Sequence, residues 1–300
     1  MNGALIVDKP SGPTSHDVVA AARRALRIRR IGHTGTLDPL ATGVLVLLLG
    51  KATRLAQFLV GDEKEYVADV RLGIATETYD AASLPKEVRR KDVRLKPDST
   101  LQLDLDRLLD DFRGTFLQTP PAFSAKKVAG ARAYEHARNR AAVELQAVQV
   151  TVNTLEVLSN SPDGLLRLRI VCSSGFYVRS LAHDLGQRLG CGAHLEALRR
   201  TRVGRFSIAD AMTLDAIEVE GPDRLIPLRA VLDDIPALTV SDEGARRAAH
   251  GNWLAPEHIA GGGVAVSAPS RVRVLDAAGD LLAVADRKDD ALLHPVVVLV

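Results

Sequence analysis

The chain has 300 residues, of which 46% are hydrophobic and 25% charged, and its formal net charge at pH 7 is +2. This composition is typical of a folded globular protein and excludes a disordered or fibrous chain. A net charge near zero also excludes RNA or DNA binding through overall charge alone, so the placement of the basic residues matters more than their number.

The start of the chain predicts neither a membrane span nor a secretion signal. The apolar run at residues 44–49 is far shorter than the roughly 20 residues that a membrane helix needs. The first five residues lack the basic region and cleavage site of a signal peptide. Cys172 and Cys191 lie in separate segments, which predicts buried thiols rather than a disulfide framework or a metal cluster. We therefore expect a cytoplasmic protein.

The first 30 residues predict a strand, a turn and a basic helix. Apolar residues 5–7 lead into residues 8–13, which are rich in proline, glycine and serine. Thr14 or Ser15 can then cap a helix, because apolar residues recur at helical spacing up to Leu26. This helix and the residues after it carry a run of five arginines: Arg23, Arg24, Arg27, Arg29 and Arg30.

Residues 32–43, Gly-His-Thr-Gly-Thr-Leu-Asp-Pro-Leu-Ala-Thr-Gly, predict a shaped loop. Three glycines and one proline fit neither a helix nor a strand. An Asp-Pro pair such as Asp38-Pro39 is most often a simple turn. Here, however, the glycines restrain the backbone around one carboxylate, His33 lies five residues earlier, and the arginine run lies just upstream. A rigid loop that presents a carboxylate beside positive charge suits an anionic substrate and a covalent or acid–base step.

The rest of the first 235 residues alternates between helical and extended patterns. This mixture predicts an α+β protein with a mixed, largely antiparallel sheet. In chain order we expect a buried strand at 44–49, a helix at 51–59, a strand at 65–72, a polar surface excursion at 81–103, a helix around 105–112, long strands at 148–157 and 165–171, and a helix at 176–189.

After about residue 235 the pattern changes. A helical stretch at 242–250 is followed by three glycines at 261–263 and then by short β-rich runs. We therefore expect two domains, residues 1–235 and a small β-rich module of residues 236–300.

Residues 32–45 closely resemble the signature loop of the TruB family, the enzymes that convert uridine 55 of the tRNA T-loop to pseudouridine. The likeness covers roughly residues 3–230. The chain departs from the family pattern after Asp80, where Ala-Ala-Ser-Leu follows, and we assign that segment no role. Further segments match in the family's order: residues 5–12, 14–17, 64–66, 72–80, 120–138, 172–179 and 190–200.

The resemblance implies a pseudouridine synthase fold with a central cleft, an RNA-contacting insertion at about 120–140 and a PUA-like RNA-binding domain at 236–300. It implies tRNA, through its T-arm, as the partner, with no guide RNA and no membrane, and a protein that works as a monomer. Neither a cofactor nor a metal is expected, because the reaction is an internal rearrangement without net redox change or hydrolysis.

The resemblance also implies roles for individual residues. Asp38 acts as nucleophile or base, and Arg179 pairs with it and keeps the carboxylate ionised. Tyr66 stacks on the target base and can take part in a proton transfer. Tyr177, two residues before Arg179, faces the same side if both lie on a strand, and so forms part of the pocket wall. His33 assists base flipping by occupying the space that the base leaves.

Basic residues outside the first helix form two further clusters. Three such clusters in a nearly neutral protein predict a surface that follows RNA phosphates. One cluster lies in the insertion and contains Lys126, Lys127, Arg132 and Arg138. The other contains Arg199, Arg200, Arg202 and Arg205. Among these, Lys126, Lys127, Arg138, Arg199 and Arg200 are the expected RNA contacts.

Other functions fit the sequence less well. A non-catalytic RNA-binding module explains the basic clusters but not the loop around Asp38. A P-loop phosphate-handling enzyme is disfavoured, because no Gly-Lys-Ser/Thr follows the glycine-rich loop. A metal-dependent hydrolase is disfavoured, because the sequence has no clustered His or Cys residues and no paired carboxylates. A relative that depends on a guide RNA is the nearest rival, but residues 40–43, Leu-Ala-Thr-Gly, resemble the stand-alone bacterial form.

Overall fold

A computed structural model describes residues 1–83, 99–123, 127–128, 131–132, 145–261, 270–288 and 292–300. Lys126 and Arg138, two of the expected RNA contacts, lie outside these ranges. Of Lys127 the structure describes only the backbone, in a two-stranded ribbon of β6 (Lys127–Val128) and β7 (Ala131–Arg132).

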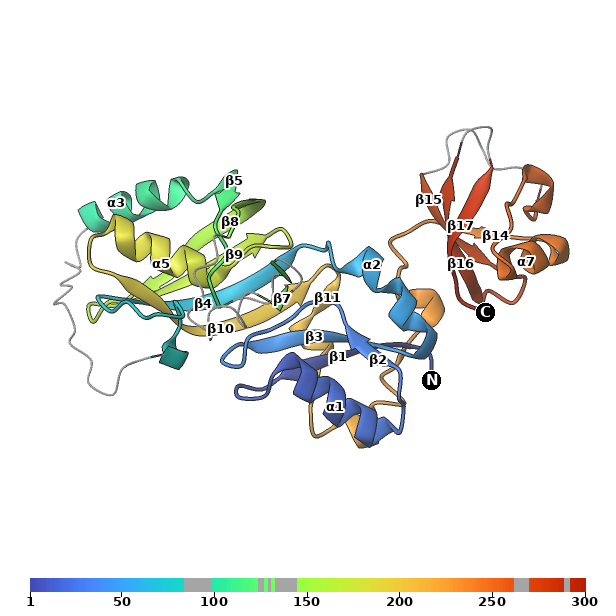
Figure 1. Cartoon of the computed structure of the whole chain (residues 1–300), viewed down its shortest axis with the longest axis horizontal. Helices are drawn as coiled ribbons and strands as arrows, with labels where there is room; N and C mark the ends of the chain where they lie inside the picture. The colour runs from blue at the N-terminus through green and yellow to red at the C-terminus, as the bar shows by residue number, and fades with distance from the viewer. Residues whose placement is uncertain (84–98, 124–126, 129–130, 133–144, 262–269, 289–291) are drawn as a thin grey trace.

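Eleven of the described strands form one mixed sheet, and most neighbouring strands are antiparallel. Its main path runs β12-β1-β3-β10-β4-β9-β8-β5 (Figure 1). This arrangement confirms the mixed, largely antiparallel sheet expected from the sequence. The strands are β1 (Gly3–Lys9), β2 (Ile31–His33), β3 (Thr42–Leu49), β4 (Lys64–Leu72), β5 (Gly114–Gln118), β8 (Val148–Asn160), β9 (Leu165–Cys172), β10 (Ala193–Val203), β11 (Phe206–Ser207), β12 (Met212–Thr213) and β13 (Ile226–Pro227).

The sheet has a narrow seam between β3 and β10. We call the part with β12, β1 and β3 the first half-sheet, and the part with β10, β4, β9, β8 and β5 the second half-sheet. Only two residue pairs join these strands, Thr42 with Arg199 and Gly43 with Arg200. By contrast, β1 pairs with β3 at seven positions and β10 pairs with β4 at nine. Gly43 has φ +100°, and a Cβ there would lie 2.1 Å from the Arg200 carbonyl oxygen. Glycine is therefore required where the half-sheets meet.

Three longer helices cover the two half-sheets. Helix α1 (Ser15–Leu26) packs on β1 and β3, and a capping box between Thr14 and Asp17 fixes its start. Helices α3 (Ser99–Asp110) and α5 (Val178–Arg188) pack on β4, β8, β9 and β10 through one apolar core (Figure 1). The shorter elements are α2 (Ala56–Leu59), α6 (Ile217–Glu220), and the 3-10 helices η1 (Gly50–Leu55), η2 (Ala81–Ser83), η3 (Ile208–Asp210) and η4 (Leu228–Ala230).

The C-terminal part of the chain forms a separate four-stranded sheet with its own apolar core. Leu281, Val284 and Leu299 nevertheless share a core with Leu55 of η1 and Leu59 of α2, so this module is packed against the larger unit. Its elements are β14 (Ala237–Thr239), α7 (Asp242–Ala249), η5 (Pro256–His258), β15 (Arg271–Leu275), β16 (Leu281–Arg287) and β17 (Leu293–Val298) (Figure 1).

Several local expectations were wrong. Tyr177 is the N-cap of α5 and Arg179 lies inside that helix, so the two residues do not share a strand face. The helix forms because Leu181, Ala182 and Leu185 bury one helical face. The loop expected at 32–43 is shorter, because β2 extends to His33 and β3 begins at Thr42. The helix expected at 51–59 is η1 followed by α2, and the expected excursion at 81–103 contains η2 and the first residues of α3 in its described parts.

Candidate active site

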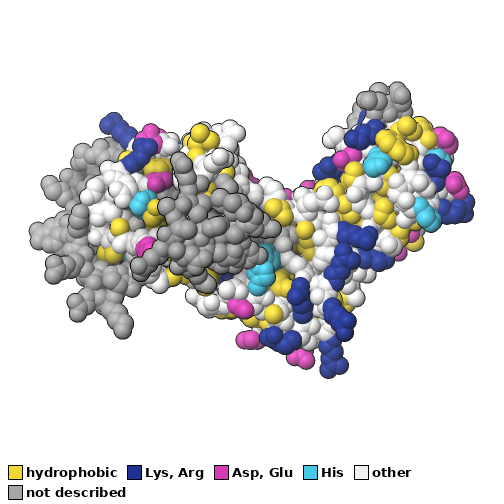
Figure 2. Space-filling model, in the orientation of Figure 1, with side chains coloured by type: hydrophobic (Ala, Val, Ile, Leu, Met, Phe, Trp, Pro, Cys, Tyr) yellow, Lys and Arg dark blue, Asp and Glu magenta, His cyan; other side chains and the backbone are white. Residues whose placement is uncertain are grey.

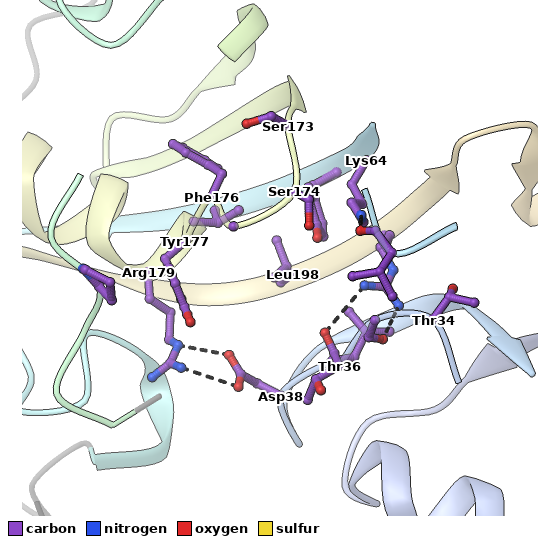
Figure 3. Close-up of a pocket in the computed structure, with 18 of the residues that line it drawn as sticks. Thr34, Thr36, Asp38, Lys64, Ser173, Ser174, Phe176, Tyr177, Arg179 and Leu198 are labelled. Atoms are coloured by element: carbon purple, nitrogen blue, oxygen red, sulfur yellow. Dashed lines mark hydrogen bonds and ion pairs between the residues drawn. The ribbon is translucent and has the colours of Figure 1, made fainter. Parts of the chain in front are cut away.

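A cavity of about 680 Å³ lies at the seam, with walls from both half-sheets (Figure 3). Its size falls within the range of small-molecule sites, and it can hold a single nucleotide. Residues 33–38 form one wall, and β4, β10 and the start of α5 form the other. Six of the expected site residues line it, and four of them are His33, Asp38, Tyr66 and Tyr177. The other two are Arg179 and Arg200.

The loop that carries Asp38 is held by buried polar groups of β1 and α1. The Nζ of Lys9 donates to the carbonyls of Ala41 at 2.7 Å and Pro39 at 3.3 Å. The Ser15 hydroxyl accepts from the Leu37 amide at 2.8 Å and donates to its carbonyl at 3.1 Å. Lys9 is fully buried and Ser15 is 1% exposed. Bonds on both sides of Asp38 thus restrain its backbone.

Arg200 also supports this loop, and the expectation that it contacts RNA from the surface was wrong. Its side chain is 2% exposed and its guanidinium donates to three carbonyls, those of Val44 at 2.7 Å, Gly35 at 3.0 Å and Thr36 at 3.4 Å. These three backbone carbonyls accept most of the hydrogen bonds that the Arg200 guanidinium can donate. Arg200 therefore ties the second half-sheet to the loop of the first.

Asp38 and Arg179 face each other across the seam (Figure 3). The Nε of Arg179 forms an ion pair with Oδ2 of Asp38 at 2.9 Å, and Nη2 donates to Oδ1 at 3.3 Å. Arg179 is 5% exposed, and it also donates to the carbonyls of Phe123 at 2.9 Å and Thr78 at 3.2 Å. A second carboxylate, that of Asp80, lies 3.8 Å from Nη1. The guanidinium is thus fixed from several sides while it faces one carboxylate in the cavity.

Opposing influences act on the Asp38 carboxyl. Burial raises its pKa, the Arg179 guanidinium lowers it, the Asp80 carboxylate raises it and Lys9 lowers it. The Asp38 side chain is 36% exposed to the cavity, so solvent moderates the effect of burial. The pKa of Asp38 remains above its ordinary value, which makes the group a better proton acceptor than a surface aspartate.

The two tyrosines lie on the wall opposite the loop. Tyr66 in β4 is 9% exposed, and burial raises the pKa of its phenol while nearby Arg200 acts in the opposite direction. The phenol is therefore uncharged near neutral pH. Tyr177 is held by its backbone, since Gln118 accepts from its amide at 2.8 Å and donates to its carbonyl at 3.1 Å. Both rings can contact a planar group in the cavity.

His33 lies at the edge of the cavity, at the end of β2. Burial and the neighbouring His16 and Arg200 lower the pKa of His33 to about 4. The His16 ring meets it edge-on, with centroids 5.6 Å apart. His33 thus presents a neutral, planar ring beside the place that a substrate base would occupy.

The basic residues differ in how free they are. Arg199 is bound to Asp8 at 2.7 Å, so its charge is already paired. The five arginines of residues 23–30 are exposed and form no ion pair within the described ranges. Figure 2 shows Lys and Arg side chains gathered over the region of α1 and the junction with the C-terminal sheet. This surface can attract a polyanion.

Two supporting residues, Lys9 and Gln118, are not predicted by the sequence, and a third, Asp80, lies in a segment that resembles the family but was given no role. A lysine that ends an apolar strand just before Pro10 was the one available signal for Lys9. Within the described residues, no three His, Cys, Asp or Glu side chains are placed to hold a metal ion. No helix in the described parts of the chain is long and apolar enough to cross a membrane.

The sequence matches two family models that together cover residues 23–235. Residues 23–178 match the TruB family pseudouridylate synthase N-terminal domain, and residues 179–235 match the tRNA pseudouridylate synthase B C-terminal domain. Over all of both chains, 43% of residues are identical to those of tRNA pseudouridine synthase B of Solibacter usitatus (strain Ellin6076). The protein of the same name in Thermobifida fusca (strain YX) is 45% identical over 99% of this chain and 98% of the relative.

Two solved structures resemble the fold over almost the whole chain. A chain in the crystal structure of a Cbf5-Nop10-Gar1 complex superposes with a TM-score of 0.71 and 26% identity, over 99% of this chain and 85% of that one. A chain of an H/ACA RNP bound to a substrate RNA containing 2′-deoxyuridine gives a TM-score of 0.70 and 26% identity, with the same coverage. These likenesses confirm the α+β fold with a small C-terminal β sheet that the sequence predicted.

Proposed function

The chain belongs to the TruB family of pseudouridylate synthases, and we propose that it converts uridine 55 in the T-loop of tRNA to pseudouridine. One observation carries the proposal for this site: a nucleotide-sized cavity in which Asp38 and Arg179 form an ion pair between the two walls. Phosphates approach from the basic surface around α1, and the base enters the cavity.

The isomerisation needs a group that acts on the nucleoside without an added reagent. The N1–C1′ bond of the uridine breaks, the base turns within the cavity, and C5 bonds to C1′. C5 then loses its proton to solvent and N1 takes one up, so the product is an isomer of the substrate. The Asp38 carboxylate can assist by attack on the nucleoside or by removal of the C2′ proton. Arg179 orients the carboxylate for either step, because its guanidinium contacts both oxygens of the Asp38 carboxylate.

The neutral rings around the cavity suit a flipped base. Tyr66 stacks on the uracil and keeps the detached base close to C1′ while it turns. His33 fills the space that the base leaves in the loop, and an uncharged ring can stack there without the cost of desolvating a charge. Tyr177 completes the wall at the start of α5.

RNA outside the cavity is held by basic residues, in our proposal. These are the arginines of α1 and its C-terminal turn, together with Lys126, Lys127 and Arg138 of the 120–140 insertion. Residues 236–300 act as a PUA-like RNA-binding domain. We infer that the protein recognises the T-arm without a guide RNA, as a cytoplasmic monomer.

The test uses a tRNA transcript carrying tritium at C5 of uridine. Since formation of the new C5–C1′ bond expels that label, we expect the wild type to release tritium to water. Asp38→Asn should release none above background. Asp69→Asn is the matched control, because Asp69 is paired with Arg167 at 2.7 Å outside the cavity. A transcript with cytidine at position 55 tests the position.

Two outcomes would contradict the proposal. Equal release from wild type and Asp38→Asn would remove Asp38 from the chemistry. No release from the wild type, with tRNA still retained in a filter-binding assay, would favour the non-catalytic RNA-binding module.

A further inference from the structure

A second group of residues supports Arg179 from the side opposite Asp38. We call residues 76–83, between β4 and the first undescribed segment, the 76–83 turn. It supplies the Thr78 carbonyl, 3.2 Å from Nη1 of Arg179, and the Asp80 carboxylate, 3.8 Å from the same nitrogen. The residue between these two contacts is Tyr79.

Tyr79 has an unfavourable backbone conformation. Its φ is +64°, and among the described residues only Arg27 is another non-glycine with positive φ. This left-handed conformation costs free energy for a residue with a Cβ and persists only where its surroundings hold it. It reverses the chain between Thr78 and Asp80, so that both face Arg179.

The Tyr79 ring is held by the helix that carries Arg179. It stacks on His183 with the ring centroids 3.8 Å apart and the planes 15° from parallel. His183 lies four residues after Arg179 in α5, so both side chains lie on one helical face. The Tyr79 carbonyl also accepts from the Leu195 amide of β10 at 2.9 Å. The turn is thereby fixed to α5 and to the sheet.

Hydrogen bonds inside the turn make it a rigid unit. The Asp80 carboxylate accepts from Thr78 Oγ1 at 2.5 Å and from the Ala82 amide at 3.0 Å. The Thr76 hydroxyl donates to the Asp80 carbonyl at 2.8 Å. A change in the position of Tyr79 would therefore move the Asp80 carboxylate and the Thr78 carbonyl together.

We propose that Tyr79 and His183 are positioning residues: their stack holds the 76–83 turn against Arg179 and so aims the guanidinium at Asp38. The inference rests on the proposed function, because Arg179 affects the reaction through Asp38. Neither ring lines the cavity, so neither is expected to contact the RNA base.

Four variants test the stack. Tyr79→Gly removes the ring and accepts a positive φ without strain, and His183→Ala removes the other ring. Tyr79→Phe keeps the stack and loses only the hydroxyl. Arg188→Ala is the matched control, because it removes a contact of α5 with an aromatic ring that is not part of the turn, that of Phe112 at 5.0 Å.

The first readout is the single-turnover rate of tritium release with tRNA affinity measured in parallel. Tyr79→Gly and His183→Ala should each lower the rate about 10-fold, with the Kd for tRNA unchanged, since a small misplacement of a catalytic group is costly. The double variant should be no slower than either single variant, because both remove the same contact. Tyr79→Phe and Arg188→Ala should match the wild type.

The second readout does not depend on turnover. The pKa of Asp38 can be followed by 13C NMR of its carboxyl carbon in the free protein. Arg179 on α5 and Lys9 on β1 lower this pKa, and Asp80 in the turn raises it. A displaced Arg179 should raise the Asp38 pKa in Tyr79→Gly and His183→Ala but not in the two controls.

Lower thermal stability in Tyr79→Gly with an unchanged Asp38 pKa would overturn the inference, because the stack would then be structural only. A rate loss in Tyr79→Phe equal to that in Tyr79→Gly would also overturn it, because the hydroxyl would then matter instead of the stack. Since the NMR readout needs no reaction, failure of the proposed function would not be mistaken for either result.

Discussion

Replacement of Arg179 by glutamine tests the central ion pair of the cavity. Glutamine is shorter, uncharged and unable to span both oxygens of Asp38 (Figure 3). Four acceptors lose their donor, the two carboxylate oxygens and the carbonyls of Thr78 and Phe123. Arg179→Lys keeps the charge but offers one donor centre in place of a planar fork.

The size of the effect follows from burial. Removal of one partner from a fully buried ion pair costs about 3–5 kcal/mol. Arg179 is 5% exposed, but the Asp38 side chain is 36% exposed to the cavity, so solvent screens part of the loss. We therefore expect Arg179→Gln to lower the free energy of unfolding by about 2–3 kcal/mol. A loss of the same size in the transition state corresponds to roughly 30- to 150-fold in rate. Arg179→Lys should fall between this variant and the wild type.

The assay is single-turnover tritium release between pH 5 and 8, with tRNA binding measured on filters. Arg179 lowers the pKa of Asp38, so its loss should raise that pKa and move the acid limb of the rate profile to higher pH. The Kd for tRNA should change little, because Arg179 is buried. A rate within 3-fold of wild type, roughly 0.6 kcal/mol, together with an unmoved acid limb would refute this reasoning.

Three further results are expected from the groups around the loop. Gly43→Ala should lower the free energy of unfolding in urea by about 3 kcal/mol or more, because its Cβ would lie 2.1 Å from the Arg200 carbonyl oxygen; Gly61→Ala, with nothing within 4 Å, is the control and should change little. The pKa of Lys9 is lowered from 10.5 to about 8, so the unfolded state binds more protons than the folded state between these two pH values. The free energy of unfolding of the wild type, relative to that of Lys9→Met, should therefore rise by up to about 3 kcal/mol from pH 8 to 10.5. A difference that does not change with pH would show that Lys9 is not desolvated. His33 should titrate near pH 4 by NMR, and a midpoint above 6 would contradict a neutral ring at the cavity edge.

The loop around Asp38 was readable because its information is local. Three glycines and a proline within residues 32–43 restrict the backbone at once, and a carboxylate among them stands out. The strands at 65–72 and 165–171 were readable for a similar reason, because apolar alternation over several residues specifies a buried face. In the structure these two segments are the strands β4 and β9.

The role of Arg200 was hidden because β10 does not alternate regularly. Bulges lie between Leu195 and Ala197 and between Arg200 and Arg202, so period-2 counting cannot say which arginine turns inward. Arg199 turns outward to Asp8, whereas Arg200 is buried beside the loop.

Lys9 and Gln118 were missed for another reason. Lysine is almost never fully buried, so residue type argued for the surface. The acceptors that make burial tolerable, the carbonyls of Pro39 and Ala41, lie 30 and 32 residues away in the chain. Gln118 reaches Tyr177 across 59 residues. Only the folded chain brings such partners together.

The two pairs that join β3 to β10 have a mechanical consequence. Asp38 belongs to one half-sheet, and Arg179 and Tyr66 belong to the other, so a small rotation about this joint changes the separation of the reacting carboxylate from its guanidinium. A joint of two residue pairs bends more easily than strands paired over seven or nine positions. RNA that binds both half-sheets can therefore use its binding energy to align Asp38 with Arg179. Substitutions on the remote faces of β1 or β9 can then change turnover allosterically, without contact with the nucleotide.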